Sequence, residues 1–286
     1  MRHLVPRPLQ PAARQLYLQI GPATSRYRME PSFLVIGGQR CGTTSIFKSL
    51  SDHPQVMRPP VEKGTDYFTL NYTRGRSWYR GHFPMAGPAR RRAGRSGPVA
   101  FEACTYYLFH PFAMERIAAD FPRIKLVAML RDPVERAFSA YKHEFARGFE
   151  TEPDFSRALD LEDERLEGEV ERMRLNPDYE SHAHRHQAYT RRGQYAEQLE
   201  RVLDHFPADQ LHVMESERFF ADPEGEFAAL LDFLGLDRWS PGGFAQHNAR
   251  PSEPMPDDVR ERLRDHYRFH DARLADLLGR QPGWVR

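Results

Sequence analysis

The feature that most constrains the fold is an alternation of short apolar segments with stretches of helical periodicity. The apolar segments read FLVIGG, VAFEA, IKLVAML and QLHVME, and they begin at residues 33, 99, 124 and 210. Each is followed by a helical pattern, at residues 43–51, 111–120, 134–147 and 223–234. Segments that are apolar throughout are typical of strands buried on both faces, and strand–helix alternation implies parallel strands. The sequence therefore predicts an α/β fold in three layers, with a central parallel β-sheet flanked by helices.

The remaining patterns fit one domain preceded by an arm. Further helices are predicted within residues 154–173, 189–206 and 257–278, and no internal repeat or linker divides the sequence. A length of 286 residues suffices for one large α/β domain with a sizeable core. Residues 1–31, rich in proline and arginine, are expected to form a poorly ordered or loosely docked N-terminal arm, and residues 32–286 to form the domain.

Composition and charge argue against several classes of function. The formal net charge of +1 gives no overall positive field of the kind that attracts nucleic acid. Cys41 and Cys104 lack the number and spacing of a disulfide framework or a metal site. No segment approaches the roughly 18 apolar residues of a membrane-spanning helix, and the N-terminal residues lack the apolar core of a secretory signal. We therefore expect a soluble, cytoplasmic protein with no nucleic-acid partner and no membrane span.

Residues 37–45 have the spacing of a phosphate-binding P-loop. Gly37 and Gly42 match the glycines of G-x-x-x-x-G-K-[ST], but Thr43 stands at the lysine position and the nearby positive charge is Arg40. A strand, a glycine turn and a helix together present backbone N–H groups and the positive helix end to an anion. The segment therefore predicts an anion site formed by Gly38, Gln39, Arg40, Cys41, Gly42, Thr43, Thr44 and Ser45.

A second anion site is predicted after the third apolar segment. Arg131 directly follows Leu130, at the strand end where open α/β sheets bind ligands. Asp132 and Pro133 are typical of a helix start, with the aspartate as N-cap and the proline in the first turn. Ser139 falls two turns into this helix. Arg131 and Ser139 are therefore predicted to bind an anionic group apart from the one on the first loop.

Together, GGQRCGTTS and RDPVERAFSAY resemble the two cofactor motifs of the sulfotransferases that use 3′-phosphoadenosine 5′-phosphosulfate (PAPS). The first is similar to the family's 5′-phosphosulfate loop, with Arg40 where lysine is usual. The second is similar to its 3′-phosphate motif, with Arg131 and Ser139 holding the phosphate that ATP lacks. The resemblance implies a P-loop-like fold and transfer of a sulfuryl group from PAPS to a hydroxyl or amine. It implies a small-molecule, glycan or lipid acceptor, possible carbohydrate sulfation, and no metal.

Other segments extend the resemblance over most of residues 33–255. Residues 66–84 and 101–108 are similar to segments of heparan sulfate N-sulfotransferases. RRGQYAEQL and NARPSEPM are similar to parts of bacterial relatives that close over the cofactor. By this resemblance Arg192, Tyr195 and Arg250 are expected to contact the cofactor.

The catalytic base is the point where this sequence departs from the heparan-type enzymes. Lys63 and Arg40 are candidates for neutralising the leaving phosphate. Lys63 matches the lysine of a Lys-Glu pair in those enzymes, but Gly64 stands where they carry the glutamate base. A lysine in the following strand segment is also replaced, here by Ala103. Another carboxylate is therefore expected to take the proton.

Three carboxylates are candidates for this base. If the segment around Gly64 is extended, Glu62 and Asp66 point to the same face as residue 64, because side chains alternate along a strand. Glu102, at a predicted strand end, is a further candidate, with a structural role beside a buried arginine as the alternative. We rank Asp66 first, Glu102 second and Glu62 third.

Two other functions remain open on the sequence. A P-loop kinase or ATPase needs Mg²⁺ and the lysine that Thr43 replaces, and a non-catalytic nucleotide-binding protein is suggested by Gly64. The histidines of HAHRH, at residues 182–186, lack a fourth zinc ligand nearby, so a polar loop that is solvated or contacts the acceptor is expected. The aromatic residues at 72, 78 and 79 fit core packing better than stacking on a sugar.

Overall fold

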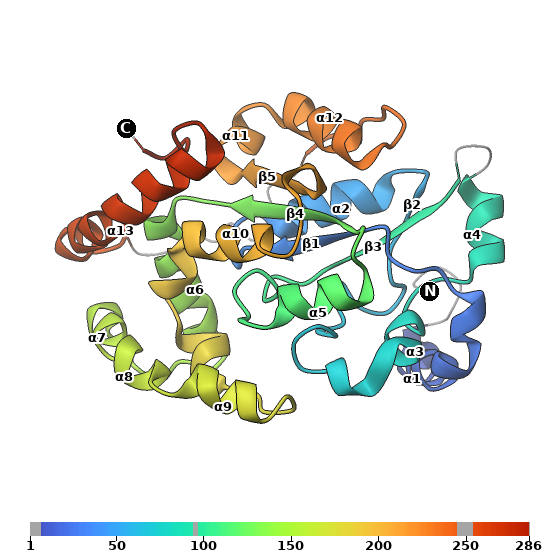
Figure 1. Ribbon diagram of the computed structural model, residues 1–286, viewed down its shortest axis with the longest axis horizontal. Coiled ribbons are helices and arrows are strands. Elements are labelled where there is room, and N and C mark those ends of the chain that lie inside the picture. Colours follow the sequence, from blue (N-terminus) through green and yellow to red (C-terminus); the bar gives the residue numbers. More distant parts are fainter. Residues whose placement is uncertain (1–6, 94–96, 245–253, 286) are drawn as a thin grey trace.

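A five-stranded, fully parallel β-sheet forms the centre of the molecule (Figure 1). The computed structural model describes residues 7–93, 97–244 and 254–285. The strands lie in the spatial order β2-β3-β1-β4-β5. They are β1 (Phe33–Gly37), β2 (Val56–Met57), β3 (Val99–Ala103), β4 (Lys125–Leu130) and β5 (Leu211–Glu215). Four strands coincide with the four apolar segments, whereas β2, with two residues, is too short to give a pattern in the sequence.

Helices connect the strands and cover both faces of the sheet. The α-helices are α1 (Gln10–Ile20), α2 (Thr43–Asp52), α3 (Gly75–Arg80), α4 (Ala86–Ala93), α5 (Ala113–Asp120), α6 (Pro133–Ala146), α7 (Phe155–Asp160), α8 (Glu162–Leu166), α9 (Glu169–Leu175), α10 (Tyr195–Leu203), α11 (Ser216–Ala221), α12 (Pro223–Leu234) and α13 (Asp257–Leu278). The shorter helical turns are η1 (Arg7–Leu9), η2 (Pro22–Tyr27), η3 (Tyr72–Arg74), the π-helix η5 (Ala183–Gln187), η6 (Arg191–Gly193) and η7 (Ala208–Gln210).

Alternate residues of β1 serve opposite sides of the sheet. Phe33 and Val35 pack with the apolar residues of α2 and α12, while Leu34 and Ile36 pack with those of α5 and α10. Figure 1 shows α2 and α12 above the sheet and α5 below it. A third apolar cluster joins α6, α7 and α13 beside the sheet. The predicted three-layer α/β fold is confirmed.

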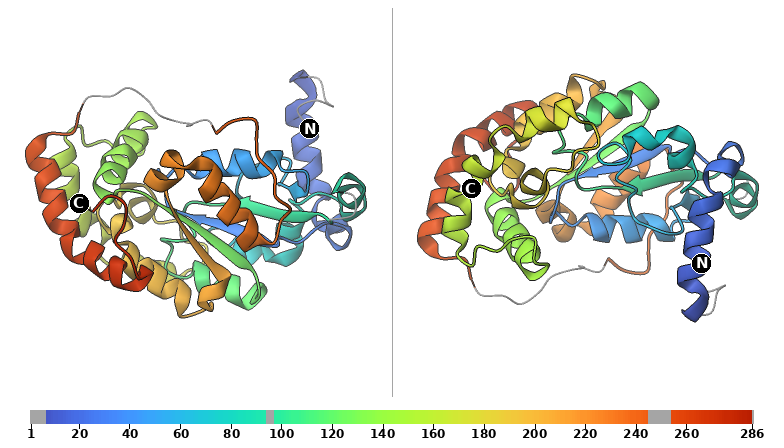
Figure 2. Two further views of the ribbon diagram at one scale, coloured as in Figure 1. Left: turned by 90° about the horizontal axis from the view of Figure 1, so that it is seen from above. Right: turned by 90° about the horizontal axis from the view of Figure 1, so that it is seen from below.

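The described part of the N-terminal arm is mostly helical from residue 7 to residue 27, which favours a docked arm over a poorly ordered one. Helix α1 has no buried residue and stands out from the molecule, at the end opposite α13 (Figure 2). Among the side chains that tie this segment to the rest of the chain, the hydroxyl of Tyr17 and the buried guanidinium of Arg28 both donate to the carbonyl oxygen of Phe83, at 2.7 and 2.9 Å. These contacts explain why a proline-rich and arginine-rich sequence docks here. No helix within the described residues is long and apolar enough to cross a membrane.

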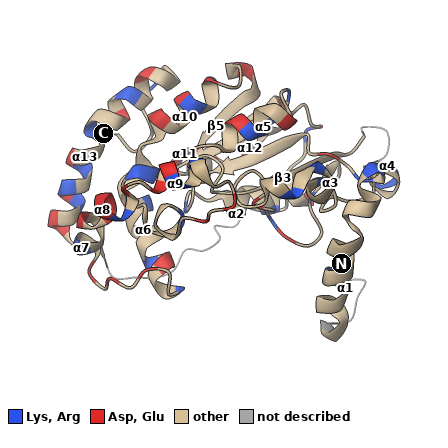
Figure 3. Cartoon of the chain, turned by 60° about the horizontal axis from the view of Figure 1, so that its bottom comes forward, with Lys and Arg blue, Asp and Glu red and all other residues tan. Residues whose placement is uncertain are grey.

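The parallel topology brings several loops to one edge of the sheet. The carboxyl ends of β3, β1 and β4 lie side by side, because β1 pairs with both of its neighbours in parallel. The loops that follow these strands contain both anion-binding segments and the segment after Ala103. At such an edge, open α/β folds bind their ligands. Away from this edge, acidic and basic residues lie interspersed along α13 (Figure 3).

Candidate active site

A cavity of about 1150 Å³ opens at the carboxyl edge of the sheet. Its basic lining residues are Arg40, Lys63, Arg131, Lys142, His143, Arg147, His182, Arg185, His186 and Arg192. Its acidic lining residues are Asp66, Glu135, Glu144, Glu180 and Glu217. Arginine and lysine outnumber the carboxylates, so the cavity is cationic although the whole chain is nearly neutral.

The turn between β1 and α2 has the shape of a phosphate-binding loop. Gly42, directly before the helix, adopts a left-handed conformation with φ of 83°, which glycine allows without strain. The amide of Gly38 donates to the carbonyl of Met129 on β4 at 2.6 Å, which fixes the start of the turn. The first-turn amides of α2, at Thr43 and Thr44, lie where a helix offers unpaired N–H groups to an anion.

Five of the eight residues predicted for the first anion site line the cavity: Gln39, Arg40, Gly42, Thr43 and Thr44. Gly38, Cys41 and Ser45 do not. The Cys41 side chain is fully buried, and burial raises the pKa of its thiol to about 11, so this cysteine is an unreactive packing residue. Gly38 and Cys41 belong to the turn, and Ser45 belongs to the first turn of α2.

Lys63 brings an ammonium group next to the first residue of α2. Its Nζ donates to Oγ1 of Thr43 at 3.0 Å, and Thr43 holds the lysine position of the motif. The group comes from the loop after β2, not from the P-loop itself. Burial lowers the pKa of Lys63 to about 8. A lysine absent from the motif is thus supplied from a different segment.

The two anion-binding motifs meet in the structure. Asp132 caps α6 by accepting from the amide of Val134 at 2.9 Å, as the sequence predicts. Nε of Arg40 donates to Oγ of Ser139 at 3.0 Å, and Nη1 of Arg131 donates to the backbone carbonyl of Arg40 at 3.3 Å. Arg40 therefore spans the first and second sites, which lie closer together than the sequence suggested.

The segment that follows Lys63 closes against the end of β3. The amide of Ala103 donates to the carbonyl of Lys63 at 3.0 Å. A Cβ placed on Gly64 would meet the carbonyl oxygen of Ala103 at 2.6 Å, so position 64 has no room for a glutamate side chain. The glycine is thus a packing requirement of this backbone path.

Asp66 lines the cavity, but the extended segment from which this position was predicted does not form. Its backbone is left-handed, with φ of 51°, so residues 62–66 are not a continuous extended strand. Its Oδ1 accepts from the thiol of Cys104 and its Oδ2 from Nη2 of Arg185, each at 2.9 Å. Arg185 also pairs with Glu180 at 2.5 Å. Each oxygen of the Asp66 carboxylate, on the cavity wall, therefore already accepts a hydrogen bond.

Glu102 and Glu62 do not line the cavity. Glu102 is completely buried and accepts from the hydroxyls of Tyr79 and Tyr107 and from the amide of Thr65. Burial raises its pKa to about 7. Its partners are tyrosines and a backbone amide, not the buried arginine considered from the sequence. Glu62 is half-exposed and pairs with Arg14 at 3.9 Å.

The aromatic segment after Asp66 forms core. Tyr67 and Tyr79 stack with ring centroids 4.4 Å apart, and Tyr72 and Trp78 pack against the same cluster. Glu102 fastens this cluster to β3 through the hydroxyl of Tyr79. None of these four aromatic side chains lines the cavity.

The histidine motif is a π-helix rather than a polar loop. His184 is buried and its Nδ1 lies 2.8 Å from the hydroxyl of Tyr106, while desolvation and Arg192 lower the pKa of this imidazole. His182 and His186 line the cavity. A π-helix is closed by hydrogen bonds between residues five apart, so its side chains do not follow the α-helical period. The alternating histidines therefore gave no α-helical pattern in the sequence.

Glu144 is a site residue that the sequence analysis missed. It lies on α6, and its Oε1 accepts from Nε2 of Gln39 at 2.7 Å while its Oε2 lies 2.9 Å from Nδ1 of His186. Burial would raise the pKa of Glu144, but hydrogen bonding from His186 and its charge hold it below the ordinary value. In the sequence Glu144 appears only as one acidic residue among the polar positions of a helix.

The remaining predicted cofactor residues are placed differently. Arg192 lines the cavity, is buried, and donates to the backbone carbonyls of His184 and Arg185. Tyr195 is buried outside the lining, where its hydroxyl donates to the carbonyl of Arg131 at 2.9 Å and so positions that residue. Arg250 lies outside the described residues, and its contact with the cofactor stays a prediction.

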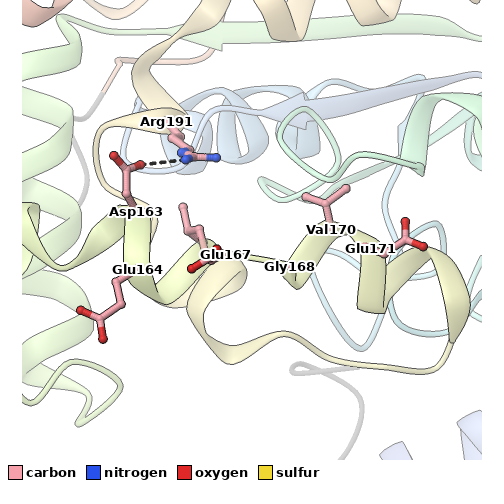
Figure 4. A pocket seen from close by; sticks show the side chains of 8 residues that line it. Asp163, Glu164, Glu167, Gly168, Val170, Glu171 and Arg191 are labelled. Carbon is pink, nitrogen blue, oxygen red and sulfur yellow. Dashed lines mark hydrogen bonds and ion pairs between the residues drawn. The ribbon is translucent and has the colours of Figure 1, made fainter.

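A second hollow has the opposite charge. It measures about 470 Å³ and lies beside α8 and α9, lined by Asp163, Glu164, Glu167, Glu171 and an arginine, Arg191 (Figure 4). Arg191 is already paired with Asp163 at 2.7 Å. This hollow is unsuited to a phosphorylated ligand. Within the described ranges, no group of three or more histidine, cysteine or acidic residues is arranged to hold a metal ion.

The fold and the cavity define a protein of the P-loop-like α/β class that binds phosphorylated ligands at the carboxyl edge of its sheet. The chain belongs to the sulfotransferase family: the family profile described as "Sulfotransferase domain" matches residues 30–248. It is therefore an enzyme that transfers sulfuryl groups, as the resemblance implied, and the kinase alternative is disfavoured.

The chain is similar to sulfotransferases from distant organisms. It is 28% identical over 301 residues to human heparan sulfate glucosamine 3-O-sulfotransferase 6, with 96% of this chain and 79% of that protein covered. It is 24% identical over 328 residues to the membrane-associated sulfotransferase kil1 of Dictyostelium discoideum, with 92% and 68% covered. A solved sulfotransferase from Alicyclobacillus acidocaldarius is 30% identical, covers 89% of this chain and 98% of its own, and superposes with a TM-score of 0.66.

Proposed function

We propose that this chain transfers a sulfuryl group from PAPS to a hydroxyl or amine of a carbohydrate acceptor. The observation that carries the proposal is the convergence of Arg40, Lys63, Arg131 and Ser139 in one cavity. A carbohydrate acceptor is supported by the printed names of several relatives, which are heparan sulfate glucosamine 3-O-sulfotransferases.

The chemistry of the cavity fits a donor that carries phosphates at both ends of a ribose. Thr43, Thr44 and the helix start would hold the 5′ end, and Arg131 with Ser139 would hold the 3′-phosphate. When bound, PAPS supplies the sulfuryl group, and its 5′-phosphate retains the electron pair of the broken sulfur–oxygen bond. Arg40 contacts Ser139 and carries the backbone carbonyl that Arg131 binds, so it would align the two ends of the donor.

Arg40 and Lys63 would stabilise the charge that develops on the leaving phosphate. A guanidinium remains charged throughout, so Arg40 would act by electrostatics alone. Lys63, with a pKa lowered to about 8 by burial, could also give up a proton near neutral pH. The two groups would divide the tasks of charge stabilisation and proton donation.

An acceptor screen tests the proposal. The purified chain would be incubated with sulfate-labelled PAPS and with glucosamine-containing oligosaccharides, phenols and lipids in parallel. We expect label on an oligosaccharide. Label on phenols or lipids alone would contradict the acceptor class, and retention of all label on PAPS would favour a non-catalytic nucleotide-binding protein.

A further inference from the structure

The π-helix η5 delivers two consecutive side chains to two carboxylates of the cavity. Arg185 reaches Asp66, and His186 reaches Glu144. These contacts separate the roles of the carboxylates: one holds an arginine, and the other holds an imidazole. We propose that His186 is the group that accepts the proton of the acceptor, an inference that rests on the proposed function and assigns its base.

Glu144 fixes the orientation of the imidazole. The carboxylate is nearly inaccessible, with 2% of its side chain exposed, and its Oε2 lies 2.9 Å from Nδ1 of His186. An ionised carboxylate can only accept a hydrogen bond, so Nδ1 carries the proton. In the neutral ring, Nε2 is then the unprotonated nitrogen. A carboxylate that holds one ring nitrogen also stabilises the imidazolium that forms when the other takes a proton.

The ring is held and accessible on the cavity side. Its centroid lies 4.2 Å from that of Phe149, and 13% of the His186 side chain is exposed. His186 lines the cavity, and Nε2 makes no hydrogen bond to another residue in the described part of the chain. A base needs such an open nitrogen within reach of its substrate.

The pair formed by His186 and Glu144 is also linked to the proposed donor site. Glu144 accepts from Gln39 through its other oxygen at 2.7 Å, and Gln39 directly precedes Arg40 in the phosphate-binding turn. One carboxylate thus bridges the loop that would hold the sulfuryl donor and the imidazole that would take the proton. Proximity of this kind is what a transfer between two bound substrates requires.

Asp66 is less suited to the same task. Both of its oxygens already accept hydrogen bonds, from Cys104 and from Arg185.

In the assigned step, the acceptor oxygen or nitrogen bonds to sulfur, the bond from sulfur to the 5′-phosphate oxygen breaks with its electrons on the phosphate, and the acceptor proton passes to Nε2 of His186. The Asp66–Arg185 pair then forms part of the cavity wall.

Chemical rescue tests this assignment. His186→Ala should lower kcat for sulfate transfer from PAPS to a heparan-type oligosaccharide by roughly 10²–10⁴-fold, the usual contribution of a positioned base. Added imidazole, which fits the space left by the side chain, should restore part of that loss. Binding of 3′-phosphoadenosine 5′-phosphate, measured by calorimetry, should stay close to wild type, which also shows that the variant is folded.

His182→Ala is the matched control, because its ring also lines the cavity but Nε2 lies 2.8 Å from the carbonyl of Phe149. Added imidazole should not raise kcat of this variant. Near-normal turnover of His186→Ala, or a loss that imidazole leaves unchanged, would overturn the assignment. So would a full loss in Asp66→Asn together with an active His186→Ala. If wild type neither binds this nucleotide nor transfers sulfate, the proposed function fails instead.

Discussion

Arg131 leaves the end of β4 with its side chain on the cavity wall and its backbone carbonyl held by Tyr195. We expect this residue to distinguish a nucleotide that bears a 3′-phosphate from one that does not. Ser139, on α6, lines the same cavity, and Arg40 contacts it from the other motif. At the scale of single residues, the proposed donor selectivity therefore depends on Arg131, Ser139 and Arg40.

Arg131→Ala should therefore weaken binding of 3′-phosphoadenosine 5′-phosphate by about 1.5–3 kcal/mol, the range of a hydrogen bond to a charged group. Binding of adenosine 5′-phosphate should barely change, because that ligand has nothing for Arg131 to hold. Calorimetric titration with both nucleotides measures the difference. Equal losses for the two ligands would sink the assignment of the 3′-phosphate site.

A second prediction at this scale concerns the charge of Lys63. Since burial lowers its pKa to about 8, the ammonium loses its charge as the pH rises through that value. We expect kcat/KM for PAPS, which reports groups of the free enzyme, to fall over the same range. Lys63→Arg keeps a charge at every accessible pH, so its profile should stay flat there. An unchanged alkaline fall in this variant would assign the titration to another group.

At the scale of elements, the segment from Lys63 to Asp66 shows what sequence patterns capture and what they miss. The four long strands and α12 and α13 follow from apolar runs and helical periods. The cap at Asp132 follows from local chemistry. The sequence predicts Asp66 as a candidate base, but the extended backbone expected for it is wrong, because its left-handed conformation depends on how the segment packs on Ala103 and no periodicity encodes it.

Local sequence patterns likewise predicted only part of the candidate active site. Motif spacing led to Arg40, Arg131 and Ser139, whereas Glu144 and Arg185 emerged only from the tertiary fold. Their partners lie 42 and 119 positions away in the chain, at His186 and Asp66. Contacts of such separation leave no local pattern in a single sequence.

Gly64→Ala tests the packing of this segment. The added Cβ would lie 2.6 Å from the carbonyl oxygen of Ala103, a backbone atom that cannot yield cheaply. We expect the free energy of unfolding to drop by about 1–3 kcal/mol, as in other overpacked sites, measured by urea denaturation. Gly242→Ala, with no atom within 4 Å of its Cβ, is the control and should stay within about 0.5 kcal/mol of wild type. A fully stable Gly64→Ala would show that the segment can move away from β3.

At the scale of the whole molecule, a nearly neutral chain concentrates positive charge at one edge of its sheet. The loops after β1 and β4 and the loop that carries Lys63 meet there, while acidic residues are prominent around the hollow beside α8 and α9. The predicted anion binding thus depends on topology, because parallel strands bring residues from distant parts of the chain to one edge.

This arrangement predicts transfer without a divalent metal. Arg40, Lys63 and the helix start can neutralise the leaving phosphate, so turnover should survive an excess of EDTA. The measurement is the initial rate of sulfate transfer with and without chelator. Loss of turnover in EDTA with recovery on adding Mg²⁺ would instead indicate chemistry of the kinase type.

The central claim is the identity of the transferred group. The most direct measurement incubates the chain with sulfate-labelled PAPS in one reaction and with ATP labelled at the γ-phosphate in another, using the same pool of oligosaccharide acceptors. We predict label on the acceptor from PAPS and none from ATP. Label transferred from ATP, or no transfer from PAPS to any acceptor of the pool, would contradict the account.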